Sequence, residues 1–256
     1  MNKPTTRRGL LRDDQRSVSE VLGYIIIFGL IITAVGFVTL LGMPALEGVL
    51  EVEQASNAER AFDVAGENMA AIYERSAPSR ATEIDLGTSE IYYGDPIVMN
   101  VTIDGESNVT EIRPVKLHVS DRTTLVYEGG AAFREEGEGG VMLREPPLLL
   151  SSDRVHVPVV KTTAPAVEAA SGTTILLRGE SADRAVLASE ANAPGPVNIT
   201  IESPRYELWE RYFTDKSAID EGDCTVDHDE ESVECQINNP ETAVVTLQEI
   251  EVSLIL

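Results

Sequence analysis

Residues 21–46 read VLGYIIIFGLIITAVGFVTLLGMPAL, a run without a single charged side chain. An α-helix needs ~20 apolar residues to cross a bilayer, whereas the apolar core of a cleaved secretory signal is usually only ~7–15 residues long. Buried helices of soluble proteins are rarely apolar over such a length. The run therefore predicts a transmembrane helix over residues 18–46.

Charge is distributed unevenly around this segment. Residues 1–20 carry five Lys or Arg and three Asp or Glu, a net charge of +2, whereas the rest of the chain carries 15 and 40, a net charge of −25. The positive-inside rule then places the basic leader, residues 1–17, in the cytoplasm. We expect a single-pass protein of the cell membrane, with its acidic C-terminal domain extracellular.

The overall composition narrows the function classes. The 256 residues contain 43 Asp or Glu against 20 Lys or Arg, a formal net charge of −23, and only four of the cations are Lys. Binding to the nucleic-acid backbone depends on Lys and Arg that neutralise phosphates, and this chain has few of them. We therefore expect no nucleic-acid partner. High acidity, little Lys and 5% aromatic residues are typical of halophilic proteins, since carboxylates stay hydrated where salt screens their repulsion. An ordinary acidic protein is the alternative.

The helical pattern continues past the membrane segment. Apolar residues recur at spacings of three and four between residues 55 and 72, with charged residues between them, which predicts an amphipathic helical extension over residues 47–78. Pro44 is expected to bend or locally melt the helix, and Pro78 to end it. The apolar stripe packs on the domain's own sheet, is shared between neighbouring subunits, or does both. Its members are Ala55, Ala58, Phe62, Ala65, Met69 and Ile72.

Small residues line one side of the predicted membrane helix. Gly29, Thr33 and Gly36 share a helical face, and such lines permit close approach between helices in lipid. They predict a helix-packing surface, although glycine is also common in membrane helices that pair with nothing.

Residues 79–256 have the pattern of a β-rich domain. Short alternating or β-branched runs are separated by Gly, Pro and Asp turn signals, which favours a sandwich or barrel. One helix is expected after Ser203 as its cap and Pro204 in its first turn, with Trp209 in the core. The fold class is thus α+β: a long N-terminal transmembrane-to-amphipathic helix followed by an extracellular β-sandwich-like domain. The expected strands are 97–103, 115–119, 155–160, 174–177, 197–201 and 242–256.

Two further patterns fit an extracellular domain. Asn100, Asn108 and Asn198 each begin an Asn-x-Thr sequon, a candidate N-glycosylation site, where about one would arise by chance. Cys224 and Cys235 bracket a short acidic loop and are predicted to form a disulfide, with two free thiols as the alternative.

Chemistry-bearing motifs are missing from the sequence. It has no glycine-rich nucleotide motif, no nucleophile elbow and no His-Glu-x-x-His, and its three His residues are scattered. The acidic residues between 220 and 231 lack EF-hand spacing, so a solvated loop is favoured over a calcium site. We therefore expect no enzyme, no catalytic residues, no metal and no cofactor.

The segment RSVSEVLGYIIIFGLIITAVGFV, residues 16–38, resembles the N-terminal region of haloarchaeal type IV pilins and archaellin-like proteins. The layout of a helix followed by a β domain resembles that of membrane-anchored secreted proteins of the same kind. The resemblance implies cleavage by a prepilin peptidase between Ser17 and Val18, and packing of the mature helices into a filament core.

These observations lead to three hypotheses of function. The first is a pilin-like cell-surface protein, anchored or polymerised through its N-terminal helix by self-assembly or with other pilin-like subunits. The second is a permanently anchored single-pass binding or sensor module. The third, which the missing motifs disfavour, is an anchored hydrolase.

Overall fold

The computed structural model describes residues 11–137, 139–164, 169–191, 195–220 and 222–256, with side chains of the first helix described at 21–40, at 53 and from 55 onward. The chain divides into two compact units, Met1–Glu53 and Gln54–Leu256, and each is described by itself. The division lies inside the first helix, so the C-terminal part of that helix belongs to the β-rich unit.

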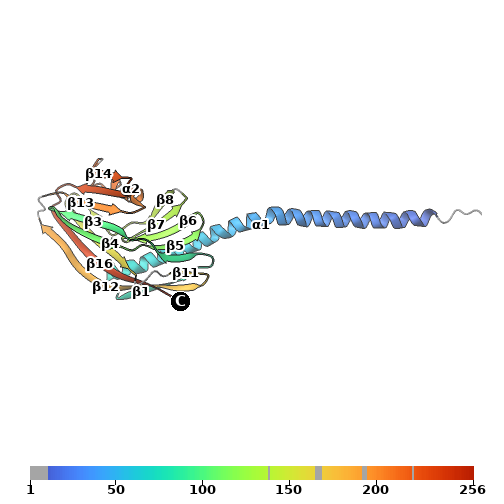
Figure 1. Ribbon diagram of the computed structural model, residues 1–256, viewed down its shortest axis with the longest axis horizontal. Coiled ribbons are helices and arrows are strands. Elements are labelled where there is room, and N and C mark those ends of the chain that lie inside the picture. Colours follow the sequence, from blue (N-terminus) through green and yellow to red (C-terminus); the bar gives the residue numbers. More distant parts are fainter. Residues whose placement is uncertain (1–10, 138, 165–168, 192–194, 221) are drawn as a thin grey trace, which may run out of the picture. The chain divides into compact units, whose positions relative to one another are not determined.

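Helix α1 spans Leu11–Arg75 and contains the predicted membrane segment (Figure 1). Its helical assignment is uninterrupted at Pro44, so the local melting expected there is absent. A proline removes one backbone donor and one i→i−4 bond, and the turns on either side hold the helix together. Ser76 then adopts a left-handed φ of 58°, and Pro78 follows two residues later, so the helix ends where the sequence predicts.

The described residues of the β-rich unit form three sheets, where a plain sandwich would have two. Sheet A has the order β1 (Ser79–Asp85), β12 (Thr174–Ala191), β16 (Thr242–Ile255), β10 (Arg154–Thr163), β9 (Leu149–Leu150). Sheet B has the order β11 (Ala169–Ser171), β2 (Glu90–Tyr93), β5 (Val115–Ser120), β6 (Thr123–Glu128), β7 (Ala131–Glu136), β8 (Gly139–Arg144). Sheet C has the order β14 (Cys224–Asp227), β15 (Ser232–Ile237), β13 (Val197–Glu202), β3 (Ile97–Ile103), β4 (Glu106–Ile112). The pairing of β10 with β16 is parallel, and the other pairings described are antiparallel.

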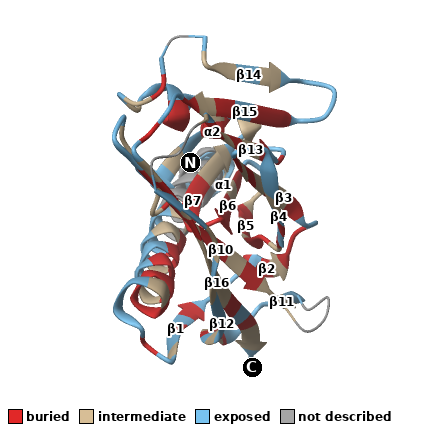
Figure 2. Cartoon of the chain, turned by 90° about the vertical axis from the view of Figure 1, so that its left-hand side faces the viewer, coloured by how far each residue is buried: buried red, intermediate tan, exposed pale blue. Residues whose placement is uncertain are grey.

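In the part of the unit that the structure describes, two hydrophobic cores hold the sheets together. Core 1 joins the inner face of sheet C to helix α2 (Tyr206–Thr214) and to the first halves of β10 and β16. Core 2 joins the buried side of α1 to residues of sheets A and B. Figure 2 shows the buried residues along these elements. Strands β10 and β16 contribute to both cores, so sheet A connects them.

Helix α2 begins differently from the expectation. Arg205 occupies the cap position without a side-chain cap, and the predicted capping by Ser203 is wrong. The Ser203 hydroxyl instead accepts a hydrogen bond from the backbone N–H of Arg205 and donates one to the buried carboxylate of Glu128. Trp209 is fully buried, as the sequence predicts.

Candidate functional site

The apolar stripe of α1 packs against the domain's own sheets. Phe62, Met69 and Ile72 are each no more than 3% exposed, which confirms the intramolecular alternative for the stripe. Strand β12 approaches the helix closely at Gly179, where a Cβ atom would lie 2.6 Å from the Met69 sulfur and 3.0 Å from Ile72 Cδ1. A side chain at this position would push the helix away, so the glycine permits the contact.

Arginines from three strands hold the polar side of α1. Arg134 of β7 pairs with Glu59 at 3.2 Å, and Arg144 of β8 pairs with Asp63 and Glu67 at 3.1 Å each. Burial alone would lower the pKa of Arg144, but the hydrogen bonds that it donates to the two carboxylates, together with their charge, outweigh burial and leave the pKa raised. We call Arg134, Arg144 and Arg184 the arginine clasp.

The third member of the clasp secures the end of the helix. The Arg184 guanidinium of β12 donates to the carbonyl of Ile72 and, at 2.8 Å, to the hydroxyl of Ser76. Terminal helix carbonyls have no intrahelical partner, so this arginine satisfies a group that the end of the helix leaves open. The clasp and the apolar stripe therefore fix the last six turns or so of α1 to the β-rich unit.

A buried ion pair links sheet B to helix α2. Glu128 at the end of β6 has no exposed surface and accepts four hydrogen bonds from three residues: Ser203, Arg205 and Trp209. The remaining Arg205 contact goes to Glu135 at 3.0 Å. Burial would lower the pKa of Arg205, yet the charge and hydrogen bonds of Glu128 leave it raised. Both carboxylate oxygens of Glu128 and most guanidinium donors of Arg205 are hydrogen-bonded. The pair therefore has a structural role, as a joint between sheet B and helix α2.

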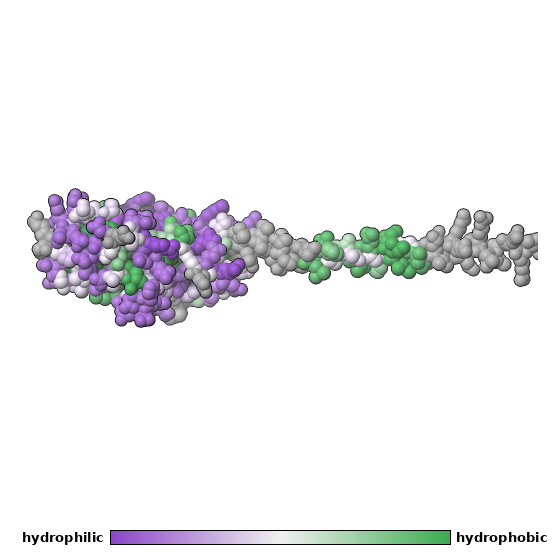
Figure 3. Space-filling view, turned by 90° about the horizontal axis from the view of Figure 1, so that it is seen from above, coloured by the Kyte–Doolittle hydropathy of each residue, from purple (hydrophilic) through white to green (hydrophobic). Residues whose placement is uncertain are grey.

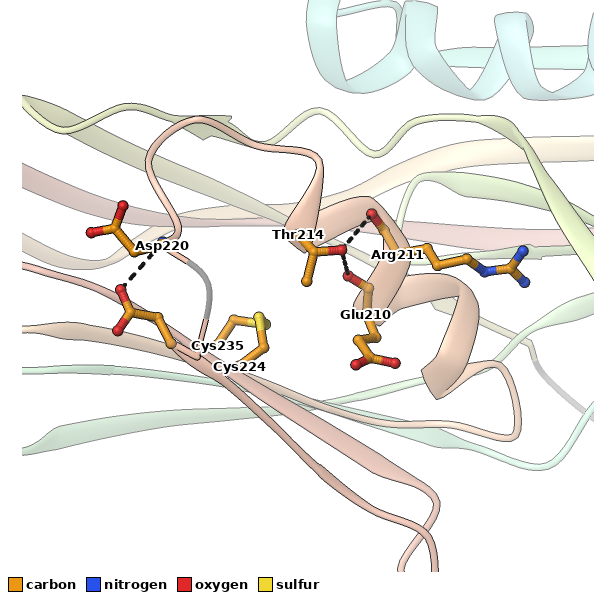
Figure 4. Close-up of a disulfide and its surroundings, with 7 residues drawn as sticks. Glu210, Arg211, Thr214, Asp220, Cys224 and Cys235 are labelled. Atoms are coloured by element: carbon orange, nitrogen blue, oxygen red, sulfur yellow. Dashed lines mark hydrogen bonds between the residues drawn. A yellow bond between two sulfur atoms is a disulfide. The ribbon is translucent and has the colours of Figure 1, made fainter.

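The cysteines pair as the sequence favours. Cys224 of β14 and Cys235 of β15 lie directly opposite each other and form a disulfide (Figure 4). Nearby, the backbone N–H of Asp220 donates to the Asp223 carboxylate at 3.3 Å. Among the described residues, no three His, Cys, Asp or Glu side chains are placed to hold a metal ion.

The histidines also lie apart from one another. His118 and His156 lie in strands and contact threonine hydroxyls at 3.3 Å, whereas His228 contacts the Tyr206 hydroxyl at 2.8 Å. Burial lowers the pKa of His156. Each histidine ring thus contacts a hydroxyl group from a neighbouring element.

Two of the three sequons interlock across neighbouring strands. In the pairing of β3 with β13, Asn198 lies opposite Thr102 and Thr200 lies opposite Asn100. Both asparagines lie on the outer face of sheet C, and their Oδ1 atoms are buried without a hydrogen-bond partner among the described residues. The period-two alternation of polar outward residues is itself enough to generate Asn-x-Thr here.

The third sequon lies at the edge of the same sheet. Asn108 of β4 is half-buried and donates to the carbonyl of Val101 at 3.3 Å. All three sequon asparagines thus lie in strands. N-glycosylation acceptors are instead expected in surface loops.

The packing line on the membrane segment is open in this chain. A Cβ at Gly29 or Gly36 would meet nothing within 4 Å, and the Thr33 hydroxyl donates to the carbonyl of Gly29 at 2.7 Å. The side chains of Ser17 and Val18, the predicted cleavage site, lie outside the described residues.

An open groove of about 750 Å³ runs along strand β4. One wall is β4 and the residue that follows it, and the other is formed by the end of β10 with Leu187 of β12 and Leu247 of β16. Sequence reasoning did not find this groove, the arginine clasp or the Glu128–Arg205 pair, because each joins residues far apart in the chain.

These features define a class of protein: an apolar N-terminal helix followed by a β-rich domain of several sheets. Within α1, Val21–Leu40 is long and apolar enough to cross a membrane, with a mean hydropathy of 2.6 and no residue buried inside the fold. The segment differs in hydropathy from the mostly hydrophilic surface of the β-rich unit (Figure 3).

The chain belongs to a family of unknown function, DUF7289, whose model matches residues 16–253. Comparisons with curated proteins and with solved structures give no match. The matched region begins next to the predicted cleavage site and includes both the apolar helix and the β-rich domain.

Proposed function

We propose that this chain is a pilin-like cell-surface protein, anchored or polymerised through its N-terminal helix, that displays the acidic β-rich domain outside the cell. One observation carries the proposal: the apolar segment Val21–Leu40 makes no buried contact in its own fold, while the same helix continues into a domain that holds it firmly. The apolar surface therefore needs lipid or other helices.

The clasp suits either of these roles. A domain displayed on a helix transmits load through the junction between them. This junction combines a buried apolar stripe with ion pairs from β7 and β8 and hydrogen bonds from Arg184 of β12. The helix and the domain would then behave as one body from Gln54 onward.

N-terminal sequencing and intact mass of the protein from its native membrane test the proposal. A mature chain beginning at Val18 supports processing by a prepilin peptidase and assembly with other pilin-like subunits. An intact leader, residues 1–17, overturns the processed-pilin reading and leaves the chain as a permanent single-pass anchor.

Cross-linking in the same membranes tests assembly separately from cleavage. Gly29→Leu and Gly36→Leu should reduce helix–helix cross-links, because they fill the surface that permits close approach. Val38→Leu is the matched control, since residue 38 lies about half a turn away from this line. Equal cross-linking in all variants would remove the packing line from the proposal.

The second candidate function is a fixed anchor that carries a binding module. The open groove beside β4 favours it, since the groove exists in the single chain and needs no assembly. Retention of the leader together with ligand binding in the groove would support this candidate over the first.

A further inference from the structure

Strand β4 is an edge of sheet C, and its hairpin turn reveals which backbone groups point outward. Asp104 and Gly105 both have positive φ, 50° and 79°, as a two-residue type I′ hairpin requires, and Ile103 pairs with Glu106. The pair that flanks such a turn is hydrogen-bonded, and hydrogen-bonded pairs then alternate along an antiparallel ladder.

This alternation assigns the free edge of β4. The register runs without a shift from Ile103–Glu106 to Ile97–Ile112. The N–H and C=O groups of Ser107, Val109 and Glu111 therefore point away from β3 and into the groove. Among the described residues, no backbone partner bonds these groups.

The next position in the alternation shows that this edge can be paired. The N–H of Arg113 donates to the carbonyl of Thr162 in β10 at 3.0 Å, and the Thr162 hydroxyl donates to the carbonyl of Arg113 at 2.5 Å. Strand β10 thus ends the free edge at Arg113. Upstream of that point, the groove lies beside Ser107, Val109 and Glu111.

Side chains in the groove set the chemistry of an occupant. Leu187 and Leu247 form an apolar part of the far wall, and Val109 is 64% exposed on β4 itself. Arg113 and Lys161 lie together at one end, two cations against the single acid Glu111 in the lining of a chain with net charge −23. Lys161 is paired with Glu249, whereas Arg113 has no side-chain partner among the described residues.

We propose that β4 binds an extended segment of a partner protein as an added strand of sheet C. The segment carries apolar β-branched residues at alternating positions and an acidic residue at the end beside Arg113. Main-chain bonds to Ser107, Val109 and Glu111 supply the affinity, and the apolar wall and Arg113 supply the selectivity, as in other cases of strand addition. This inference concerns what the domain recognises and is independent of how the helix is anchored.

The experiment uses the full chain in detergent and two blocked, fluorescent hexapeptides, Val-Thr-Val-Thr-Val-Asp and Asp-Val-Thr-Val-Thr-Val. Six residues span ~20 Å of strand, about the length of the free edge. We expect saturable binding of one of the two by fluorescence anisotropy, and the preferred position of the acid reports the strand direction. Absence of binding by both overturns the proposal.

Two N-methylated versions of the bound peptide test the main-chain bonds without altering the protein. Methyl groups on alternate residues block the N–H groups that face β4 in one version and those that face away from β4 in the other. One version should bind at least about fivefold more weakly than the other, since each lost hydrogen bond costs about that factor. Equal effects of the two patterns overturn the proposal.

Variants of the chain locate the site. Val109→Pro should weaken binding about fivefold or more while leaving unfolding unchanged, because its N–H takes no part in the ladder, and Val109→Thr is the control that retains the donor. Arg113→Gln should abolish the preference for Asp over Asn in the peptide. Binding that is unchanged in both variants contradicts the assignment, and so does self-association removed by Val109→Pro without any peptide binding, which would assign the edge to a second copy.

Discussion

The Arg205 guanidinium donates through Nε and Nη2 to the same oxygen of Glu128, at 2.9 and 2.6 Å, and neither side chain is more than 3% exposed. The pair ties the end of β6 to the start of α2. Charges buried in this way are tolerated only when paired and hydrogen-bonded, because their desolvation is costly. Here the Glu128 carboxylate also receives the Ser203 hydroxyl and the Trp209 indole N–H.

Glu128→Gln should therefore lower the free energy of unfolding by about 3–5 kcal/mol, because it leaves Arg205 buried with only Glu135 as a charged partner. The measurement is urea unfolding of the full chain in detergent, followed by Trp209 fluorescence. Glu135→Gln is the matched control and should cost about 1 kcal/mol or less, since Glu135 is 32% exposed. Similar losses for the two variants would contradict the assignment of Glu128 as the centre of the joint.

Gly179→Ala tests the contact between β12 and α1. Its Cβ would lie 2.6 Å from the Met69 sulfur and 3.1 Å from Ile250 Cγ2. Overpacking of this kind costs about 1–3 kcal/mol, and we expect that loss in urea unfolding. Gly139→Ala, where the nearest atom would be 3.9 Å away, should change stability by no more than about 0.5 kcal/mol. A neutral Gly179→Ala would show that α1 and β12 are not tightly packed.

The sequence predicted the parts of this fold that rest on local pattern. The apolar run and the 3–4 spacing predicted α1 and its buried stripe, and alternation predicted strands within β3, β5, β10, β12, β13 and β16. Strands such as β4 and β8 were missed because their residues are largely polar or exposed, so their pairing is decided by the neighbouring strand.

The candidate site could be predicted only in part. The disulfide was within reach because its cysteines are close in the sequence. Arg144 and Asp63 are 81 residues apart, and Arg205 and Glu128 are 77 apart. With 43 acids in the chain, no local pattern indicates which acid each arginine pairs with. The Gly129-Gly130 pair does mark the end of β6 locally, because both residues adopt positive φ, 60° and 86°, in the turn that follows Glu128.

Replacing both Cys224 and Cys235 with Ala should lower the free energy of unfolding by about 3 kcal/mol, given a sequence separation of 11. Alanine is chosen over serine because Cys235 is fully buried in core 1, where a serine would bury a hydroxyl group. Urea unfolding of the oxidised wild type, the reduced wild type and the variant provides the comparison. Reduction should reproduce most of the loss, and equal stability of all three would show that the bridge does not constrain the chain.

Stability should depend on pH through His156. Burial lowers the pKa of this residue in the folded chain below its ordinary value of 6.5. The unfolded chain therefore takes up the proton first as the pH falls, and stability is lost from about pH 6.5 downward. His156→Gln should flatten this part of the profile in unfolding experiments between about pH 7.5 and pH 5.

His118→Gln is the matched control, because it also removes a strand histidine that contacts a threonine hydroxyl, at the same 3.3 Å. It leaves His156 in place and should retain the slope that His156 produces. A profile that is identical in the wild type and in His156→Gln would exclude His156 as its source.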